Sequence, residues 1–187
     1  YLLPYKKELI EKKIRYKTNP KYWYALHRSR DIQMFEQPKI ITAEISYGCN
    51  MTYDTTYMYH ATTCYTILLN ERNNEKSLAF LGLFNSRLLW YFLSETGNVL
   101  RGGYFRFKTK YLEPFPIPEI PDDVADLLSK KVQTVLDAKS VDITAETKTI
   151  ENEINLLVYH LYGLTYDEAL VVDPETPITR EEYEKNM

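Results

Sequence analysis

An apolar run from Leu78 to Leu93 (LAFLGLFNSRLLWYFL) limits what this chain can fold into more than any other segment. A helix that crosses a bilayer needs about 20 predominantly apolar residues, and this run is shorter. It also carries a polar Asn-Ser-Arg triplet at its centre, residues 85–87. The run therefore predicts a helix buried in a protein core, and the sequence shows neither a signal peptide nor a membrane span. Ser77 is a candidate N-cap, and Gly97 lies near the expected C-terminal end.

Segments rich in β-branched and aromatic residues predict a sheet on both sides of this helix. Residues 39–45 (KIITAEI) predict one strand, and residues 104–108 (YFRFK), which alternate aromatic and basic side chains, predict another. Residues 57–69 (YMYHATTCYTILL) predict one or two more, and the polar residues 70–74 predict a loop. A short amphipathic helix is expected over residues 4–16. Its apolar stripe consists of Leu9, Ile10 and Ile14.

The chain after Pro118 has the pattern of a helical hairpin. Pro121 and the acidic pair that follows it are typical of a helix start, because carboxylates favour the positive end of the helix dipole. A second helix is expected from about Thr144 to Tyr162, where Gly163 ends it. Thr165 and Glu168 then match a capping box for a short third helix.

These patterns predict an α/β (α+β) fold, with a curved, mostly antiparallel sheet and packed helices followed by the helical hairpin. We expect a body over residues 1–118 and a helical region over residues 119–172. Residues 173–187 are acidic and contain two prolines, so we expect a poorly ordered tail. The chain starts at Tyr1 without a Met, and we expect it to be a fragment of a longer protein.

The formal net charge of −3 hides a division along the chain. Residues 1–112 hold 17 Lys and Arg against 9 Asp and Glu, whereas residues 113–187 hold 6 against 17. A weakly acidic protein can still bind nucleic acid if its cations are gathered on one surface. The alternative is that the Lys-rich start of the chain is only the solvated face of a helix.

Catalytic chemistry is not indicated. Asn19-Pro20-Lys21-Tyr22 is superficially similar to the Asn-Pro-Pro-Tyr motif of adenine methyltransferases, but the second proline and the preceding apolar strand are missing. The sequence has no glycine-rich loop that would bind S-adenosylmethionine, so we expect no cofactor in this fragment. Its histidines are scattered, and Asp122, Asp123 and Asp126 suit a helix start better than a metal site. Cys49 and Cys64 indicate reduced thiols in a cytosolic protein.

Several motifs are similar in order and spacing to those of a known family. They are Trp23-Tyr24 with Arg28 and Arg30, Pro38–Ile41 with Glu44–Ser46, Asn85–Leu88 with Trp90-Tyr91, Arg101–Gly103, Pro116–Pro118 and Leu161–Leu164. Over residues 1–172 the chain resembles the TaqI-like C-terminal specificity domain of restriction-modification enzymes. The resemblance implies a domain that recognises double-stranded DNA behind an N-terminal adenine-methylating domain. That domain of the parent chain would bind S-adenosylmethionine, and the parent enzyme could also cleave DNA.

The resemblance also implies which residues contact DNA. Arg28, Arg30 and Lys39 are expected to position phosphates. The segment from Tyr47 to Thr62, rich in Asn, Thr and Tyr, is expected to read base edges, because these side chains discriminate bases without binding every phosphate. Its candidate residues are Tyr47, Asn50, Thr52, Tyr53, Tyr57, Tyr59, His60 and Thr62. The opposite strand or the backbone is expected to be held by Arg101, Arg106, Lys108 and Lys110, and Tyr104 beside them is expected to contact DNA. For each tyrosine the alternative is plain strand packing.

A second class of function stays open at this point. The heptad-like spacing of Ile143, Ile150, Ile154, Leu157 and Leu161 suits a protein-interaction or dimerisation module as well.

Overall fold

The computed structural model describes residues 1–16, 22–24 and 31–185, and the chain forms two compact units, Tyr1–Gln37 and Pro38–Met187. The first unit contains the short 3-10 helices η1 (Leu3–Tyr5) and η2 (Ile32–Met34) and the helix α1 (Lys6–Tyr16). The expected helix near the N-terminus is thereby confirmed, although Ile14 of its stripe is 72% exposed. His27, Arg28, Arg30 and most of the Asn19–Tyr22 segment lie outside the described residues.

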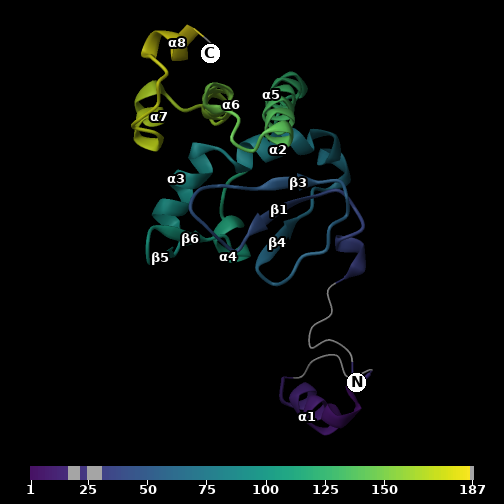
Figure 1. Ribbon diagram of the computed structural model, residues 1–187. Helices are drawn as coiled ribbons and strands as arrows, with labels where there is room; N and C mark the ends of the chain where they lie inside the picture. The colour runs from purple at the N-terminus through teal and green to yellow at the C-terminus, as the bar shows by residue number, and fades with distance from the viewer. Residues whose placement is uncertain (17–21, 25–30, 186–187) are drawn as a thin grey trace. The chain divides into compact units, whose positions relative to one another are not determined.

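The second unit holds two small antiparallel sheets (Figure 1). One has the order β3-β1-β4, with β1 at Lys39–Ala43, β3 at Thr52–Asp54 and β4 at Cys64–Ile67. The other has the order β2-β6-β5, with β2 at Ile45–Ser46, β5 at Val99–Leu100 and β6 at Tyr104–Arg106. The mixed helix and sheet class is confirmed, but the strand expected over 39–45 is divided in two.

Glu44 is the point at which the chain passes from one sheet to the other. Its N–H donates to the carbonyl of Thr63 beside β4 (2.7 Å), and its carbonyl accepts from the N–H of Phe107 beside β6 (2.8 Å). Each backbone group of this one residue therefore extends a different ladder. The two sheets are therefore joined through the backbone of this single residue.

The apolar run forms two helices instead of the single helix expected. These are α2 (Ser77–Phe84) and α3 (Arg87–Thr96). Ser86 ends the first helix by donating its hydroxyl to the Leu83 carbonyl (2.7 Å) and caps the second by accepting from the Leu89 N–H (3.3 Å). The break is thus a capping event inside an apolar segment, while Gly97 ends α3 as expected.

The segment before α2 also differs from expectation. Residues 70–74 were expected to form a loop, but all of them except Asn70 belong to the 3-10 helix η3 (Glu71–Lys76). Ser77 is not an N-cap, because it is the first residue of α2 and its hydroxyl donates to the Asn74 carbonyl (2.6 Å). Asn70 caps the preceding helix η3 by accepting from the Asn73 N–H.

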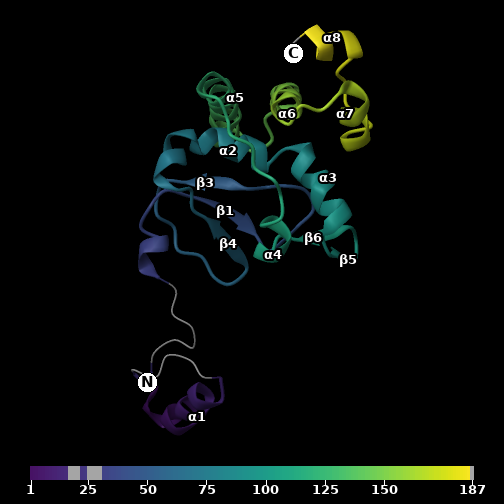
Figure 2. The same ribbon diagram turned by 180° about the vertical axis from the view of Figure 1, so that it is seen from behind.

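The helices after Pro118 belong to the same compact unit as the sheets. A short helix, α4 (Thr109–Leu112), precedes them, and α5 (Asp122–Val141) and α6 (Lys148–Leu161) pack on α2. Both views show α5 and α6 on one side of the unit, with β4, β5, β6 and α4 on the other (Figures 1 and 2). The apolar side chains of α6 at Ile150, Ile154, Leu157 and Leu161 contact the core. The heptad-like pattern therefore serves the fold, except at Ile143, which is 79% exposed.

The C-terminal segment, expected to be a poorly ordered tail over residues 173–187, contains a helix and a buried tyrosine in its described part, residues 173–185. The predicted capping box of Thr165 and Glu168 begins α7 (Tyr166–Val172), and α8 (Arg180–Lys185) follows. Tyr183 is only 1% exposed and donates its hydroxyl to the Leu164 carbonyl (2.7 Å), while Arg180 forms an ion pair with Asp167. Burial of one aromatic ring fixes a segment whose composition alone suggests disorder. His160, expected to be a packing residue, lies edge-on to this ring, with the two ring centroids 4.4 Å apart.

Within the described residues, no helix is both long and apolar enough to cross a membrane.

Close packing of α2 against α5 generates a prediction. A Cβ atom on Gly82 would lie 2.9 Å from Cγ2 of Val132, which is too close, and 3.4 Å from Cγ2 of Ile154, which leaves it no room to move away. Gly82→Ala should therefore lower the free energy of unfolding by about 1 kcal/mol, because overpacking costs about 1–3 kcal/mol while the helix preference of Ala returns about 1 kcal/mol. Urea denaturation measures this. Val132→Ala should make room for the new methyl, so strictly additive losses in the double variant would contradict the packing described.

Candidate nucleic-acid interface

A buried ion pair underlies the loop between β3 and β4, residues 55–63. Lys39 and Asp54 are register partners in β1 and β3, and their side chains are 0% and 4% exposed. Nζ of Lys39 lies 2.5 Å from Oδ2 of Asp54. The expectation that Lys39 positions a phosphate is therefore wrong, because its ammonium group is enclosed and neutralised in the protein interior.

The Asp54 carboxylate also organises the loop itself. It accepts from the N–H of Thr56 (2.9 Å), the hydroxyl of Thr56 (2.8 Å) and the N–H of Met58 (2.8 Å). Burial by itself would raise the pKa of Asp54, but the donations from Lys39, Thr56 and Met58 outweigh burial and hold the pKa well below its usual range. The carboxylate is ionised at neutral pH and fully satisfied by donors.

The β3–β4 loop presents most of its side chains outward. Tyr57 and Tyr59 are 48% and 59% exposed, and Thr62 is exposed as well. His60 is half-buried, with Nε2 at 2.7 Å from Oγ1 of Thr66 and Nδ1 at 3.1 Å from the carbonyl of Ala61. Of the strands expected over 57–69, only β4 is present, and β3 lies before that range. The reason is that Asp54 holds residues 56 and 58 in a turn instead of leaving their backbone groups to a ladder.

The two candidate residues on β3 differ in environment. Thr52 is exposed, whereas Tyr53 packs against the hydrophobic core. For Tyr53 the alternative of plain strand packing thus describes the structure better than base reading does.

A second part of the candidate surface lies at the β5–β6 hairpin. Gly102 and Gly103 have φ of +87° and +79°, so the turn that carries the exposed Arg101 depends on residues that accept left-handed backbone. Tyr47 packs over this turn, because a Cβ on Gly103 would lie 3.3 Å from its ring. Ring centroids join Tyr47 to Tyr104 at 5.9 Å and to Trp90 at 6.1 Å. The aromatic cluster leads from exposed Tyr47 and Tyr104 to buried rings beneath.

The cations of this region differ in whether a nearby carboxylate neutralises them. Arg106 lies 2.8 Å from a carboxylate oxygen of Glu44, and Lys108 lies 3.8 Å from the same oxygen. Lys110 is placed over the ring of Tyr111, 4.5 Å from its centroid. Arg101 forms no ion pair with any residue that the structure describes. Arg101 and Lys110 are therefore the cations least committed to carboxylates, and the part that these four play in binding stays a prediction.

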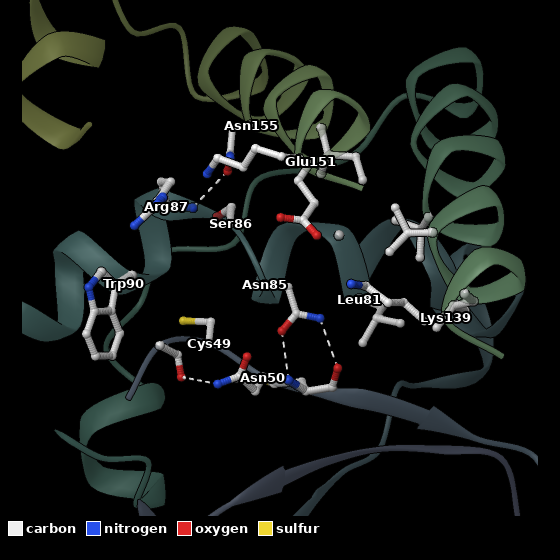
Figure 3. Close-up of a pocket in the computed structure, with 18 of the residues that line it drawn as sticks. Cys49, Asn50, Leu81, Asn85, Ser86, Arg87, Trp90, Lys139, Glu151 and Asn155 are labelled. Atoms are coloured by element: carbon white, nitrogen blue, oxygen red, sulfur yellow. Dashed lines mark hydrogen bonds between the residues drawn. The ribbon is translucent and has the colours of Figure 1, made fainter. Parts of the chain in front are cut away.

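A pocket of about 690 Å³ lies behind this region, between the β2–β3 loop, the α2–α3 corner, α5 and α6 (Figure 3). The Asn85 side chain joins the loop to the corner: its Oδ1 accepts from the Met51 N–H (2.7 Å) and its Nδ2 donates to the Met51 carbonyl (3.0 Å). On the other side, Oδ1 of Asn155 accepts from the Arg87 N–H (2.8 Å). Sequence reasoning did not assign these roles, and the polar residues interrupting the apolar run were the available signal.

Asn50 and Cys49 line this pocket, and the structure limits what each side chain can bind or react with. The Asn50 side-chain nitrogen donates to Oγ of Ser46 (3.0 Å) and to the Tyr47 carbonyl (3.2 Å), so its donor group already shapes the loop. Burial raises the pKa of the Cys49 thiol to about 12, and the Arg87 charge offsets this only in part. The thiol is therefore protonated at neutral pH and unsuited to nucleophilic attack. Among the residues that the structure describes, no cluster of His, Cys, Asp or Glu could hold a metal ion.

Substitution of Asp54 tests the contribution of its buried ion pair with Lys39. Asp54→Asn should lower the free energy of unfolding by about 3–5 kcal/mol, because the Lys39 ammonium would be left buried and uncompensated. The lowered pKa of Asp54 means that its stabilising contribution is present above the ordinary carboxyl pKa of about 4 and is lost as the pH falls toward the folded value. The variant should therefore lose stability less steeply than the parent protein in acid, as measured by urea denaturation across pH.

Lys39→Met/Asp54→Asn is the matched control for this change. It removes the buried positive charge, and Asn can still accept from Thr56 through its one oxygen, although the donation from Met58 to the second oxygen is lost. Part of the stability should therefore return. A double variant that is no more stable than Asp54→Asn would show that the cost does not come from the unpaired lysine.

Comparison with known protein families identifies the family of this chain. A family model described as the TaqI-like C-terminal specificity domain matches residues 4–117, which is more than half of the chain. The matched range includes both sheets, the β3–β4 loop, the β5–β6 hairpin and the helix pair α2–α3. The chain belongs to the family of TaqI-like C-terminal specificity domains, found in restriction-modification enzymes.

Proposed function

We propose that this chain recognises a specific sequence in double-stranded DNA for an adenine-methylating restriction-modification enzyme. Family membership supports the proposal, and the distribution of carboxylates carries it. Between Ile45 and Asn70 the only acidic residue is Asp54, and between Thr96 and Leu112 there is none. Carboxylates near phosphates would oppose binding, so their exclusion from these loops on a chain with an acidic total composition is what a DNA-binding surface requires.

The two carboxylates that do occur in the sheets are both neutralised. Asp54 is buried with Lys39, and Glu44 is shared by Arg106 and Lys108. Together these five groups carry a net positive charge. The helices α5 and α6, whose sequences contain several Asp and Glu residues, lie on the other side of the unit from β4, β5 and β6 (Figure 1).

In this account phosphate contacts hold the duplex and base contacts select the sequence. Arg101 and Lys110 bind phosphates directly, and Arg106 and Lys108 contribute beside Glu44. Exposed polar and aromatic side chains of the β2–β3 and β3–β4 regions face base edges. The residues proposed for this reading are Tyr47, Asn50, Thr52, Tyr57, Tyr59, His60 and Thr62, with Tyr104 on the hairpin.

The methyl transfer itself belongs to a catalytic domain on the same parent chain, N-terminal to the specificity domain. That domain would bind S-adenosylmethionine, and this chain would position the duplex while the target adenine is flipped out. Such an enzyme acts in the cytoplasm, where the host DNA lies.

Affinity for DNA of random sequence tests the proposed phosphate contacts. Binding to a random-sequence duplex, followed by fluorescence anisotropy over a range of salt concentrations, should give a linear fall of log affinity with log salt. Arg101→Ala should reduce the slope by about one phosphate contact and weaken all duplexes alike. Lys130→Ala, which removes the same charge from the exposed surface of α5, is the matched control and should leave the slope unchanged. Equal effects of the two changes would remove Arg101 from the interface.

Selection of a preferred DNA sequence tests the proposed base contacts. Thr52→Val keeps the shape and the strand preference of an exposed β3 residue but removes its hydroxyl. Selection from a randomised duplex pool should show a relaxed or altered preference at one position of the site, because a lost base contact is worth about 1–3 kcal/mol of discrimination. Random-duplex affinity should stay the same. If the selected site is identical to that of the parent protein, Thr52 does not read a base.

A further inference from the structure

The tip of the β3–β4 loop combines exposed apolar side chains with an unfavourable backbone. Tyr57, Met58 and Tyr59 are consecutive, and 48%, 63% and 59% of their surfaces are exposed. Tyr57 has φ of +61° and is the only non-glycine with positive φ among the described residues. Glycine and asparagine occupy this left-handed region far more readily than tyrosine. Since the ring is not buried within the protein, packing does not offset the strain.

Hydrogen bonds hold the strained residue in place from both sides. Thr56 and Met58, which flank Tyr57, donate their N–H groups to the two oxygens of the Asp54 carboxylate. That carboxylate is fixed from below by Lys39. The loop is joined again to β4 through His60 and Thr66. The Tyr57 and Met58 side chains therefore project from a hydrogen-bonded base, and the loop cannot relax without losing its donations to the buried Asp54 carboxylate.

The chemistry around the tip suits a nucleic acid. Residues 55–70 contain no Asp or Glu, and the neighbouring Asp54 is neutralised. Exposed hydroxyl side chains surround the apolar tip at Thr55, Thr62 and Thr63, and hydroxyls commonly donate to phosphate oxygens. An apolar point bordered by uncharged hydrogen-bond donors is the arrangement used by proteins that insert side chains between base pairs.

We propose that Tyr57 and Met58 form a wedge that enters a base step of duplex DNA. This inference rests on the proposed function and adds a mechanism to it. The wedge partly unstacks the step and replaces the lost base stacking with contact to the tyrosine ring and the methionine side chain. The strained backbone aims the tyrosine ring outward before DNA arrives, so little conformational freedom is lost on insertion. Tyr59 flanks the wedge, and Thr55 and Thr63 contact the phosphates beside it.

A duplex with a preformed gap tests the wedge directly. The probe is a short random-sequence duplex, either intact or with one central abasic site. Because the abasic step has already lost its stacking, the parent chain should bind the abasic duplex about 10-fold or more tightly than the intact one. Tyr57→Asn/Met58→Ser should bind both duplexes with the same affinity. Asn accepts the left-handed backbone and Ser keeps the Met58 N–H, so the melting temperature should not fall.

Matched changes on another surface distinguish the wedge from non-specific binding by exposed apolar side chains. Leu127→Asn/Val141→Ser removes two exposed apolar side chains of α5 and should leave the preference for the abasic duplex intact. If the first double variant melts at a lower temperature, Tyr57→Gly takes its place, since glycine also suits the backbone.

The possible results separate the wedge from the function on which it rests. Equal binding of both duplexes by the parent chain would overturn the wedge while leaving DNA recognition in place. So would a preference that survives in the variants, or a loss of self-association in the variants without any change in DNA binding. Failure of the parent chain to bind either duplex would overturn the proposed function and the wedge together.

Discussion

The buried ion pair of Lys39 and Asp54 determines how this domain presents its surface. The two residues join β1 to β3 in register, and one carboxylate of this pair also fixes the turn that follows β3. A buried charge is tolerated only when it is paired and fully hydrogen-bonded, and Asp54 meets this condition with four donations. The same interaction that stabilises the sheet therefore sets the conformation of its most exposed loop.

Glu44 has the corresponding role between the two sheets. Its backbone groups extend both ladders, and its carboxylate is shared by Arg106 and Lys108 of the second sheet. Both acidic residues of the sheet region are thus used internally, and the loops beside them are left without negative charge. Structure and charge are coupled here: a surface compatible with phosphates results from the same contacts that hold the sheets together.

Local signals in the sequence predicted local structure, and long-range contacts account for most errors. Gly163, the Thr165 capping box and the mixed fold class could be recognised because each depends on neighbouring residues or on composition. Lys39 looked like a phosphate-binding cation because its partner lies 15 residues away, on a strand of three residues that has no pattern of its own. The acidic composition of the C-terminal tail suggested disorder. The burial of Tyr183 could not be foreseen from it, since that burial depends on contacts with α6 and α7. The exposed candidates, such as Arg101 and Thr52, could be chosen by residue type, because cations and hydroxyl groups are common donors to DNA.

The most direct measurement of the central claim is hydrogen–deuterium exchange of the whole chain, with and without a saturating random-sequence duplex. The account predicts slower exchange on DNA binding in residues 55–63 and 99–110, with little change in α5 and α6. Protection confined to α5 and α6, or to the residues lining the pocket of Figure 3, would contradict the assignment of the DNA-binding surface to the two sheets and their loops.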